Sequence, residues 1–192
     1  NELTRWVLVK VPNEHFAQQA GMSLETAMQF FFEASLLNWE EERRRYRELA
    51  EVFEAATEVD IQGTDTDLTF STAGRHYVAG DGEFNMPDGE IFTAPVDDSA
   101  NGEVWFEVPA FYANKKIPGI RLRFENGVVV EASADENGEF LEQILAMDAG
   151  ARRLGEFGIG LNWAIHRWTN EGLVDEKIGG TIHLALGRAY AE

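Results

Sequence analysis

The 192-residue sequence has no cysteine, no long apolar run and no visible signal peptide. Without cysteine, the chain has no disulfide, no thiolate metal site and no cysteine nucleophile. No stretch approaches the roughly 20 apolar residues that a membrane-spanning helix needs. These absences are compatible with a reducing compartment, and we expect a cytoplasmic protein without a membrane partner.

Basic residues are also scarce, because 16 Lys and Arg stand against 34 Asp and Glu and give a formal net charge of −18. Nucleic-acid binding requires a basic patch that displaces counterions from phosphates. The one basic stretch, residues 43–47, follows three glutamates directly, which is typical of a salt-bridged helix face. We therefore expect no nucleic-acid partner, and the acidic surface also disfavours anionic membranes.

The first 56 residues predict one strand and two helices. Residues 6–11 alternate and are rich in valine, and Pro12 ends them. Ser23 is a candidate N-cap, because apolar residues after it recur at the i, i+3, i+4 and i+7 spacing of one helical face. A second helix is expected from about residue 38 to residue 56.

From residue 58 onward the pattern changes to short strands, at residues 59–61, 68–70, 103–110, 120–124 and 128–130. Asn126-Gly127 between the last two is the strongest short-range signal for a type I′ hairpin. A further helix is expected at about residues 138–152 and a strand at residues 181–186. The sequence therefore predicts an α+β fold with a mixed, largely antiparallel sheet and flanking helices.

Several common catalytic motifs are absent. The glycines of residues 155–160 do not follow the G-x-G-x-x-G order of a dinucleotide-binding turn. The sequence also has no phosphate-binding loop, no H-E-x-x-H zinc helix and no G-x-S-x-G nucleophile elbow. The candidate catalytic or metal-binding residues are therefore single residues with unusual sequence surroundings.

His183 and Glu90 are two such residues. In the strand Thr181–Leu186, alternation places His183 away from the apolar face, and a strand holds a metal ligand more firmly than a loop does. Glu90 ends the tight turn of residues 85–90. An ordinary core or surface histidine and a solvated carboxylate stay open as alternatives.

Glu156 and Tyr190 also have unusual surroundings. Glu156 lies among the glycines of residues 155–160, which permit close approach of the backbone, and a carboxylate there is desolvated unless a cation neutralises it. Tyr190 follows His183 by seven residues, and Gly187 between them permits a bend that brings both to one site. A purely structural role stays open for each.

These four residues lie in segments that resemble the thermophilic metalloaminopeptidases of family M29. The likeness runs from about residue 20 to residue 192 and is clearest in four blocks, residues 85–96, 119–127, 150–160 and 175–188. The resemblance implies that residues 57–192 are the metal-binding catalytic domain of that family. Residues 1–56 would then be the end of its N-terminal region.

The resemblance implies a site with two divalent ions, zinc or cobalt. The matching ligands are Glu90 in N-M-P-D-G-E, Glu156 in G-E-F-G-I-G, His183 in G-T-I-H-L-A-L-G and Tyr190 in G-R-A-Y. Glu156 is expected to bridge the ions and to act in catalysis. The family's last two ligands, a His-x-Asp pair, lie beyond Glu192, so we expect a fragment whose metal domain is incomplete at its C-terminus.

The implied activity is the release of N-terminal residues from short peptides by a water that two ions activate. The family forms homodimers, for which Phe30-Phe31-Phe32, Trp163 and Trp168 are candidate contacts, with core packing as the alternative. Two other interpretations stay open. One is a catalytically silent binding or dimerisation module that retains the family fold, and the other is a metal-free hydrolase in which Glu90 and Glu156 form an acid–base pair.

Overall fold

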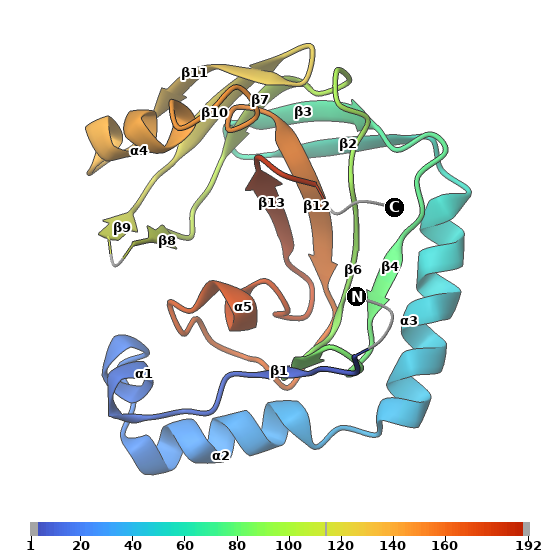
Figure 1. Cartoon of the computed structure of the whole chain (residues 1–192), viewed down its shortest axis with the longest axis vertical. Helices are drawn as coiled ribbons and strands as arrows, with labels where there is room; N and C mark the ends of the chain where they lie inside the picture. Colours follow the sequence, from blue (N-terminus) through green and yellow to red (C-terminus); the bar gives the residue numbers. More distant parts are fainter. Residues whose placement is uncertain (1–3, 114, 190–192) are drawn as a thin grey trace. The chain divides into compact units, whose positions relative to one another are not determined.

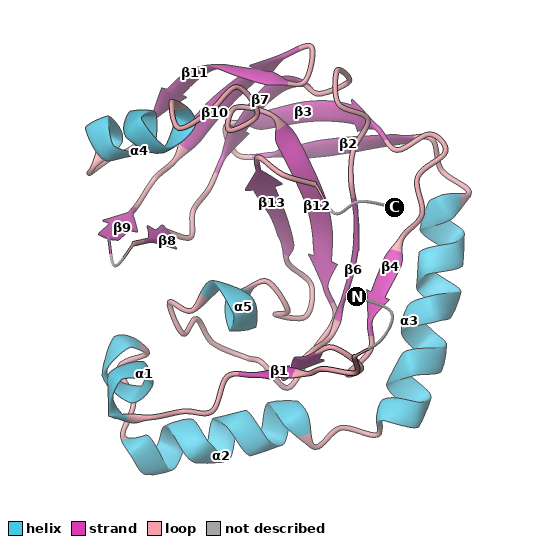
Figure 2. Ribbon diagram, in the orientation of Figure 1, coloured by secondary structure: helices cyan, strands magenta, loops and turns pink. Residues whose placement is uncertain are grey.

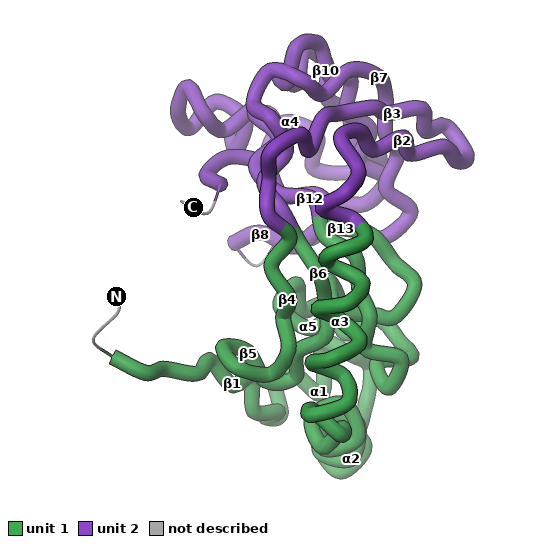
Figure 3. The backbone as a smooth tube through the Cα atoms, turned by 90° about the vertical axis from the view of Figure 1, so that its right-hand side faces the viewer, with its two compact units in different colours: residues 1–52, 77–92, 158–183 green, residues 53–76, 93–157, 184–192 purple. Residues whose placement is uncertain are grey.

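The computed structural model describes residues 4–113 and 115–189 (Figure 1). It divides into two compact units, each assembled from separate stretches of the chain (Figure 3). Unit 1 contains the residues up to Val52 together with Tyr77–Phe92 and Gly158–His183, and unit 2 contains the rest. The fold is α+β with mostly antiparallel sheets, as the sequence predicts (Figure 2). The predicted domain boundary after residue 56 stays a prediction.

Most of the helical residues lie in unit 1. Its helices are α1 (Glu14–Gln19), α2 (Leu24–Ser35), α3 (Trp39–Glu54, which ends just past the unit boundary) and α5 (Gly172–Asp175). Ser23 caps α2, because its hydroxyl accepts a hydrogen bond from the backbone N–H of Thr26 at 3.1 Å. The two longer helices were predicted. The two short ones were not, since a helix of one turn leaves too little periodicity to recognise.

The core of unit 1 joins its N-terminal helices to the segment around α5. Eight buried residues form it: Phe16, Ala17, Ala20, Ala27, Phe30, Ala34, Ile165 and Val174. Phe30 and Phe31 are buried, as the core-packing alternative predicts, whereas Phe32 is exposed. A dimer contact at this segment stays a prediction. Burying these side chains places α5, and the residues that follow it, beside the first helices.

Unit 1 contains two pairs of short strands. β1 (Leu8–Val9) pairs in parallel with β5 (Asn85–Met86), so the predicted strand over residues 6–11 is only partly formed. β4 (Val78–Gly80) pairs antiparallel with β6 (Glu90–Thr93), in a four-stranded sheet of order β13-β12-β6-β4. The other two strands of that sheet are β12 (Leu154–Gly160) and β13 (Ile182–Leu186), of which only residues 158–160 and 182–183 belong to unit 1.

Unit 2 contains a five-stranded antiparallel sheet of order β11-β10-β7-β3-β2. Its strands are β2 (Glu58–Gly63), β3 (Thr66–Ser71), β7 (Asn101–Trp105), β10 (Arg121–Glu125) and β11 (Val128–Ser133). The predicted hairpin turn is confirmed, because Asn126 and Gly127 have φ angles of 50° and 77°, the left-handed values that a type I′ turn requires.

Unit 2 also contains a two-stranded antiparallel pair, β8 (Ala110–Tyr112) with β9 (Lys115–Ile117), and the helix α4 (Gly138–Leu145). The helix ends well before residue 152, the predicted end, because Ala146 leaves helical geometry. Within the described residues, no helix is both long and apolar enough to cross a membrane.

Candidate metal centre

Glu90 is the first residue of β6, and its side chain is buried, with 5% of the residue exposed. Its Oε2 atom has no hydrogen-bond partner in the structure, although it lies 3.2 Å from His183 Nε2. Burial raises the pKa of Glu90, and the nearby Lys177 and His183 oppose that rise. A buried carboxylate oxygen without a hydrogen bond is costly unless a cation compensates it.

The turn before Glu90 is fixed by hydrogen bonds. The carboxylate of Asp88 accepts from the backbone N–H groups of Gly82 and Gly89 at 3.0 and 2.9 Å. Asn162 is fully buried, and its Nδ2 donates to the carbonyl oxygens of Asp88 and Ala34 at 2.7 and 2.9 Å. Both the side chain and the carbonyl group of Asp88 are therefore hydrogen-bonded, and these bonds fix the backbone that leads into Glu90.

His183 lies on β13, and its imidazole sits against the backbone of Gly158 on β12. A Cβ atom built on Gly158 would lie only 2.1 Å from His183 Nε2. Only glycine leaves room for the ring in this position. Of the three glycines in the G-E-F-G-I-G block, Gly158 is the one that contacts the imidazole.

Glu176 and Lys177 follow α5 and were not identified from the sequence as site residues. The Lys177 side chain is completely buried, and its Nζ lies 3.0 Å from Glu90 Oε1 and 2.5 Å from Glu176 Oε1. Burial acts to lower the pKa of Lys177, but the carboxylates of Glu90 and Glu176 outweigh it, so the pKa is raised. The ammonium group therefore stays charged between the two carboxylates.

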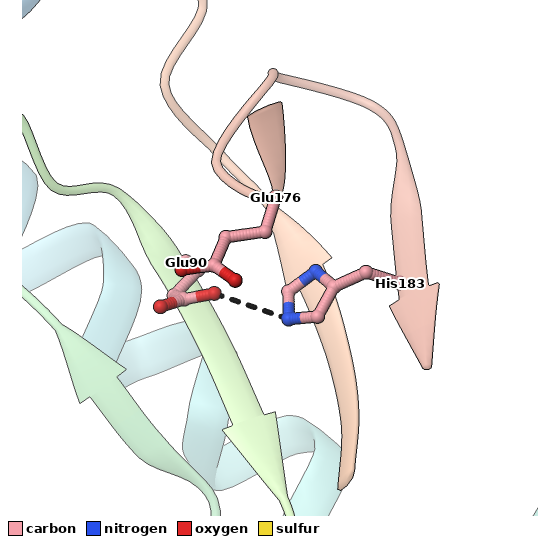
Figure 4. A group of neighbouring side chains, drawn as sticks. All are labelled: Glu90, Glu176 and His183. Atoms are coloured by element: carbon pink, nitrogen blue, oxygen red, sulfur yellow. Dashed lines mark ion pairs between the residues drawn. The ribbon is translucent and has the colours of Figure 1, made fainter. Parts of the chain in front are cut away.

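Glu90, Glu176 and His183 form one cluster, which we call the Glu–Glu–His cluster. Each offers a ligand atom, and these atoms lie within 4.8 Å of one another, with all three side chains directed toward a common point (Figure 4). All three residues belong to unit 1. Two carboxylates and one imidazole are a donor set that zinc and similar divalent ions accept. Glu90 Oε2, which has no hydrogen-bond partner, faces this point, so the residues present fit a divalent cation.

The structure thus brings together two of the four residues predicted as ligands, Glu90 and His183. Glu156 is half-buried on β12 and belongs to unit 2, outside the described cluster, and Tyr190 lies outside the described residues. The assignments of Glu156 and Tyr190 stay predictions. Glu176 was missed, although the sequence carries one signal for it: three adjacent charged residues between the apolar residues Val174 and Ile178.

Comparison with known proteins gives a family match over the whole chain. The family model for thermophilic metalloproteases (M29) matches residues 1–192. Aminopeptidase T of Thermus aquaticus is 36% identical over 147 residues, covering 69% of this chain and 35% of that protein. Aminopeptidase AmpS of Bacillus subtilis is 34% identical over 143 residues, covering 68% of this chain and 34% of that protein. The chain thus spans about a third of the length of these two relatives.

The fold comparison agrees with the sequence match. Wild-type AmpT from Thermus thermophilus superposes with a TM-score of 0.76 at 30% identity, covering 87% of this chain and 46% of that chain. The 2,5-dihydroxypyridine dioxygenase of Pseudomonas putida superposes with a TM-score of 0.63 at 16% identity, covering 79% of this chain and 49% of that chain, a likeness of fold alone.

Proposed function

Because the chain belongs to the M29 family of thermophilic metalloproteases, we propose that it is part of a metal-dependent aminopeptidase that releases N-terminal residues from short peptides. The observation that carries this proposal is the Glu–Glu–His cluster, in which the buried Glu90 Oε2 has no hydrogen-bond partner. The relatives named aminopeptidase support the choice of peptide substrates. Zinc or cobalt is the ion that we expect.

In this proposal Glu90, Glu176 and His183 hold one divalent ion. When bound there, the ion would supply Lewis-acid chemistry, through which a scissile carbonyl would be polarised and the pKa of a water molecule lowered. Glu90 supplies negative charge from a dry environment, where its attraction to a cation is screened least. Gly158 fixes the ring of His183, and Lys177 offsets part of the negative charge when no cation is bound.

Two further assignments belong to the same proposal. Glu156 would bridge this ion to a second one and take part in catalysis, and Tyr190 would be an additional ligand. Two ions need more donors than three side chains provide, so this part of the proposal depends on residues outside the cluster.

The test is metal binding together with hydrolysis of amino acid p-nitroanilides in the presence of zinc or cobalt. Replacing Glu90 or Glu176 by glutamine should weaken zinc binding at least tenfold in calorimetry, because each change removes a charged ligand. Any hydrolysis should fall with it. Glu51→Gln is the matched control, since Glu51 is exposed on α3 in the same unit. Zinc affinity unchanged in Glu90→Gln would exclude the cluster as a metal site.

A catalytically silent binding or dimerisation module is the second candidate function. It is favoured by the three donors of the cluster, which are fewer than a two-ion site needs. The same assay separates the two candidates. Clear turnover by this chain would contradict the silent module, whereas zinc binding without turnover under any metal condition would favour it.

A further inference from the structure

We propose that Lys177 is a positioning residue that holds one oxygen of Glu90 and one oxygen of Glu176, so that Glu90 binds a divalent ion through Oε2 alone. This inference rests on the proposed metal site and deepens it, because it states how one ligand coordinates. It concerns a residue that neither the sequence pattern nor the family resemblance identified.

The contacts of Lys177 carry the argument. Its Nζ lies 3.0 Å from Glu90 Oε1 and 2.5 Å from Glu176 Oε1, both within charge-assisted hydrogen-bond distance. The other oxygen of Glu90, Oε2, is buried, lacks a hydrogen bond and lies 3.2 Å from His183 Nε2. The two oxygens of Glu90 are therefore not equivalent: one is engaged by the ammonium group, and the other faces the cluster.

Hydrogen bonds also fix the backbone around Lys177. The carbonyl oxygen of Lys177 accepts from the backbone N–H of Asn162 at 3.0 Å, and the N–H of Gly179 donates to the carbonyl of Asn162 at 3.0 Å. The N–H of Lys177 itself donates to the carbonyl of Val174 at 3.2 Å. With both ends fixed and no exposed surface, the side chain has little freedom to leave Glu90.

The charges of the cluster explain why a lysine is present at a cation site at all. Without Lys177, two carboxylates would lie close together in a buried environment and repel each other, which favours rotation of one of them out of the cluster. One ammonium group offsets one of the two negative charges and leaves an excess that attracts a divalent ion. Groups that hold metal ligands by hydrogen bonds typically affect metal affinity by about 10- to 100-fold.

A purely electrostatic role of Lys177 and a positioning role predict opposite changes in zinc affinity when Lys177 is removed. If Lys177 only repelled the incoming ion, its removal would strengthen metal binding. If Lys177 positions the carboxylates, its removal weakens binding by at least tenfold. The sign of the change in zinc affinity therefore separates the two roles.

The experiment compares zinc binding by wild type, Lys177→Met and Lys177→Gln in calorimetry. Lys177→Met removes both the charge and the donor, whereas Lys177→Gln retains a donor and should recover part of the affinity. Lys116→Met is the matched control, because Lys116 is exposed in unit 2 and should leave the affinity unchanged. Equal or tighter zinc binding by folded Lys177→Met would overturn the positioning role.

A second measurement does not depend on whether the variants fold. In the zinc-bound crystal structure of the wild-type protein, Glu90 should contact the ion through Oε2 while Oε1 stays within hydrogen-bond distance of Lys177 Nζ. Coordination through both oxygens, or a Lys177 side chain turned away from Glu90, would overturn the inference. Absence of zinc binding by the wild type would overturn the proposed metal site and this inference together.

Discussion

Gly158 determines where the imidazole of His183 can lie. The ring occupies the volume that a Cβ atom on residue 158 would fill, so the lack of a side chain at residue 158 makes room for a proposed metal ligand. Lys177 likewise positions Glu90, in this case through an ion pair between its ammonium group and Glu90 Oε1. At the scale of residues, the cluster therefore depends on two neighbours that are not themselves ligands.

Replacing Gly158 by alanine should displace His183 and weaken zinc binding at least tenfold. The added methyl group overpacks the site, which typically costs about 1–3 kcal/mol of folding stability. Calorimetry with zinc and urea unfolding measure the two effects. Gly172→Ala is the control, because a Cβ atom there meets nothing within 4 Å. Equal losses of affinity in both variants would contradict the assigned role of Gly158.

At the scale of elements, Asn162 joins the segments that carry the cluster. Its side chain donates to the backbone just before β6 and at the end of α2, and its own backbone bonds to the segment that follows α5. Glu90 and Lys177 lie on two of these segments. The relative placement of the ligands within unit 1 therefore depends on one buried amide side chain.

Replacing Asn162 by alanine should lower the free energy of unfolding by about 2–3 kcal/mol, because it leaves the buried carbonyl oxygens of Asp88 and Ala34 without their donor. Zinc affinity should fall in the same variant. Urea unfolding monitored by circular dichroism checks the first effect. Gln18→Ala, an exposed change on α1, is the control and should shift the unfolding midpoint little. A variant as stable as wild type would contradict this account of Asn162.

At the scale of the whole molecule, the net charge of −18 and the family membership both bear on function. The acidic composition favours cations over polyanions, in keeping with a metal site. The two relatives compared in sequence are about three times as long as the stretch that this chain matches. The metal content of the chain can be measured directly.

We expect one tightly held zinc ion per chain, because the described donors form a single cluster of three. Calorimetry with the 192-residue chain, or metal analysis after dialysis, measures this stoichiometry. Chelation with EDTA should remove the ion and lower the thermal stability, since an ion that binds only the folded state stabilises it. Two ions bound with equal affinity would contradict this expectation and would require donors beyond the cluster, which is the role that the family resemblance implies for Glu156 and Tyr190.

The sequence by itself determined the features that depend on near neighbours. The cap of Ser23, the helix over residues 39–54 and the hairpin at Asn126-Gly127 follow from local chemistry that acts over a few residues. Family resemblance singled out four residues, Glu90, Glu156, His183 and Tyr190. Of these, Glu90 and His183 lie together in the structure, with Glu90 Oε2 3.2 Å from His183 Nε2. Lengths were less predictable, as the early end of α4 shows, because tertiary contacts override weak propensities at element ends.

Only the tertiary structure decided which residues complete the cluster. Glu176 and Lys177 look like ordinary surface charges in the sequence, yet folding brings them to Glu90, which lies more than 80 positions earlier. The requirement for glycine at position 158 is also visible only in the structure, where the His183 ring fills the space beside it. In the sequence, a glycine in a strand can have several structural roles. Burial, and contact between distant segments, arise when the core of unit 1 forms, and no local pattern encodes them.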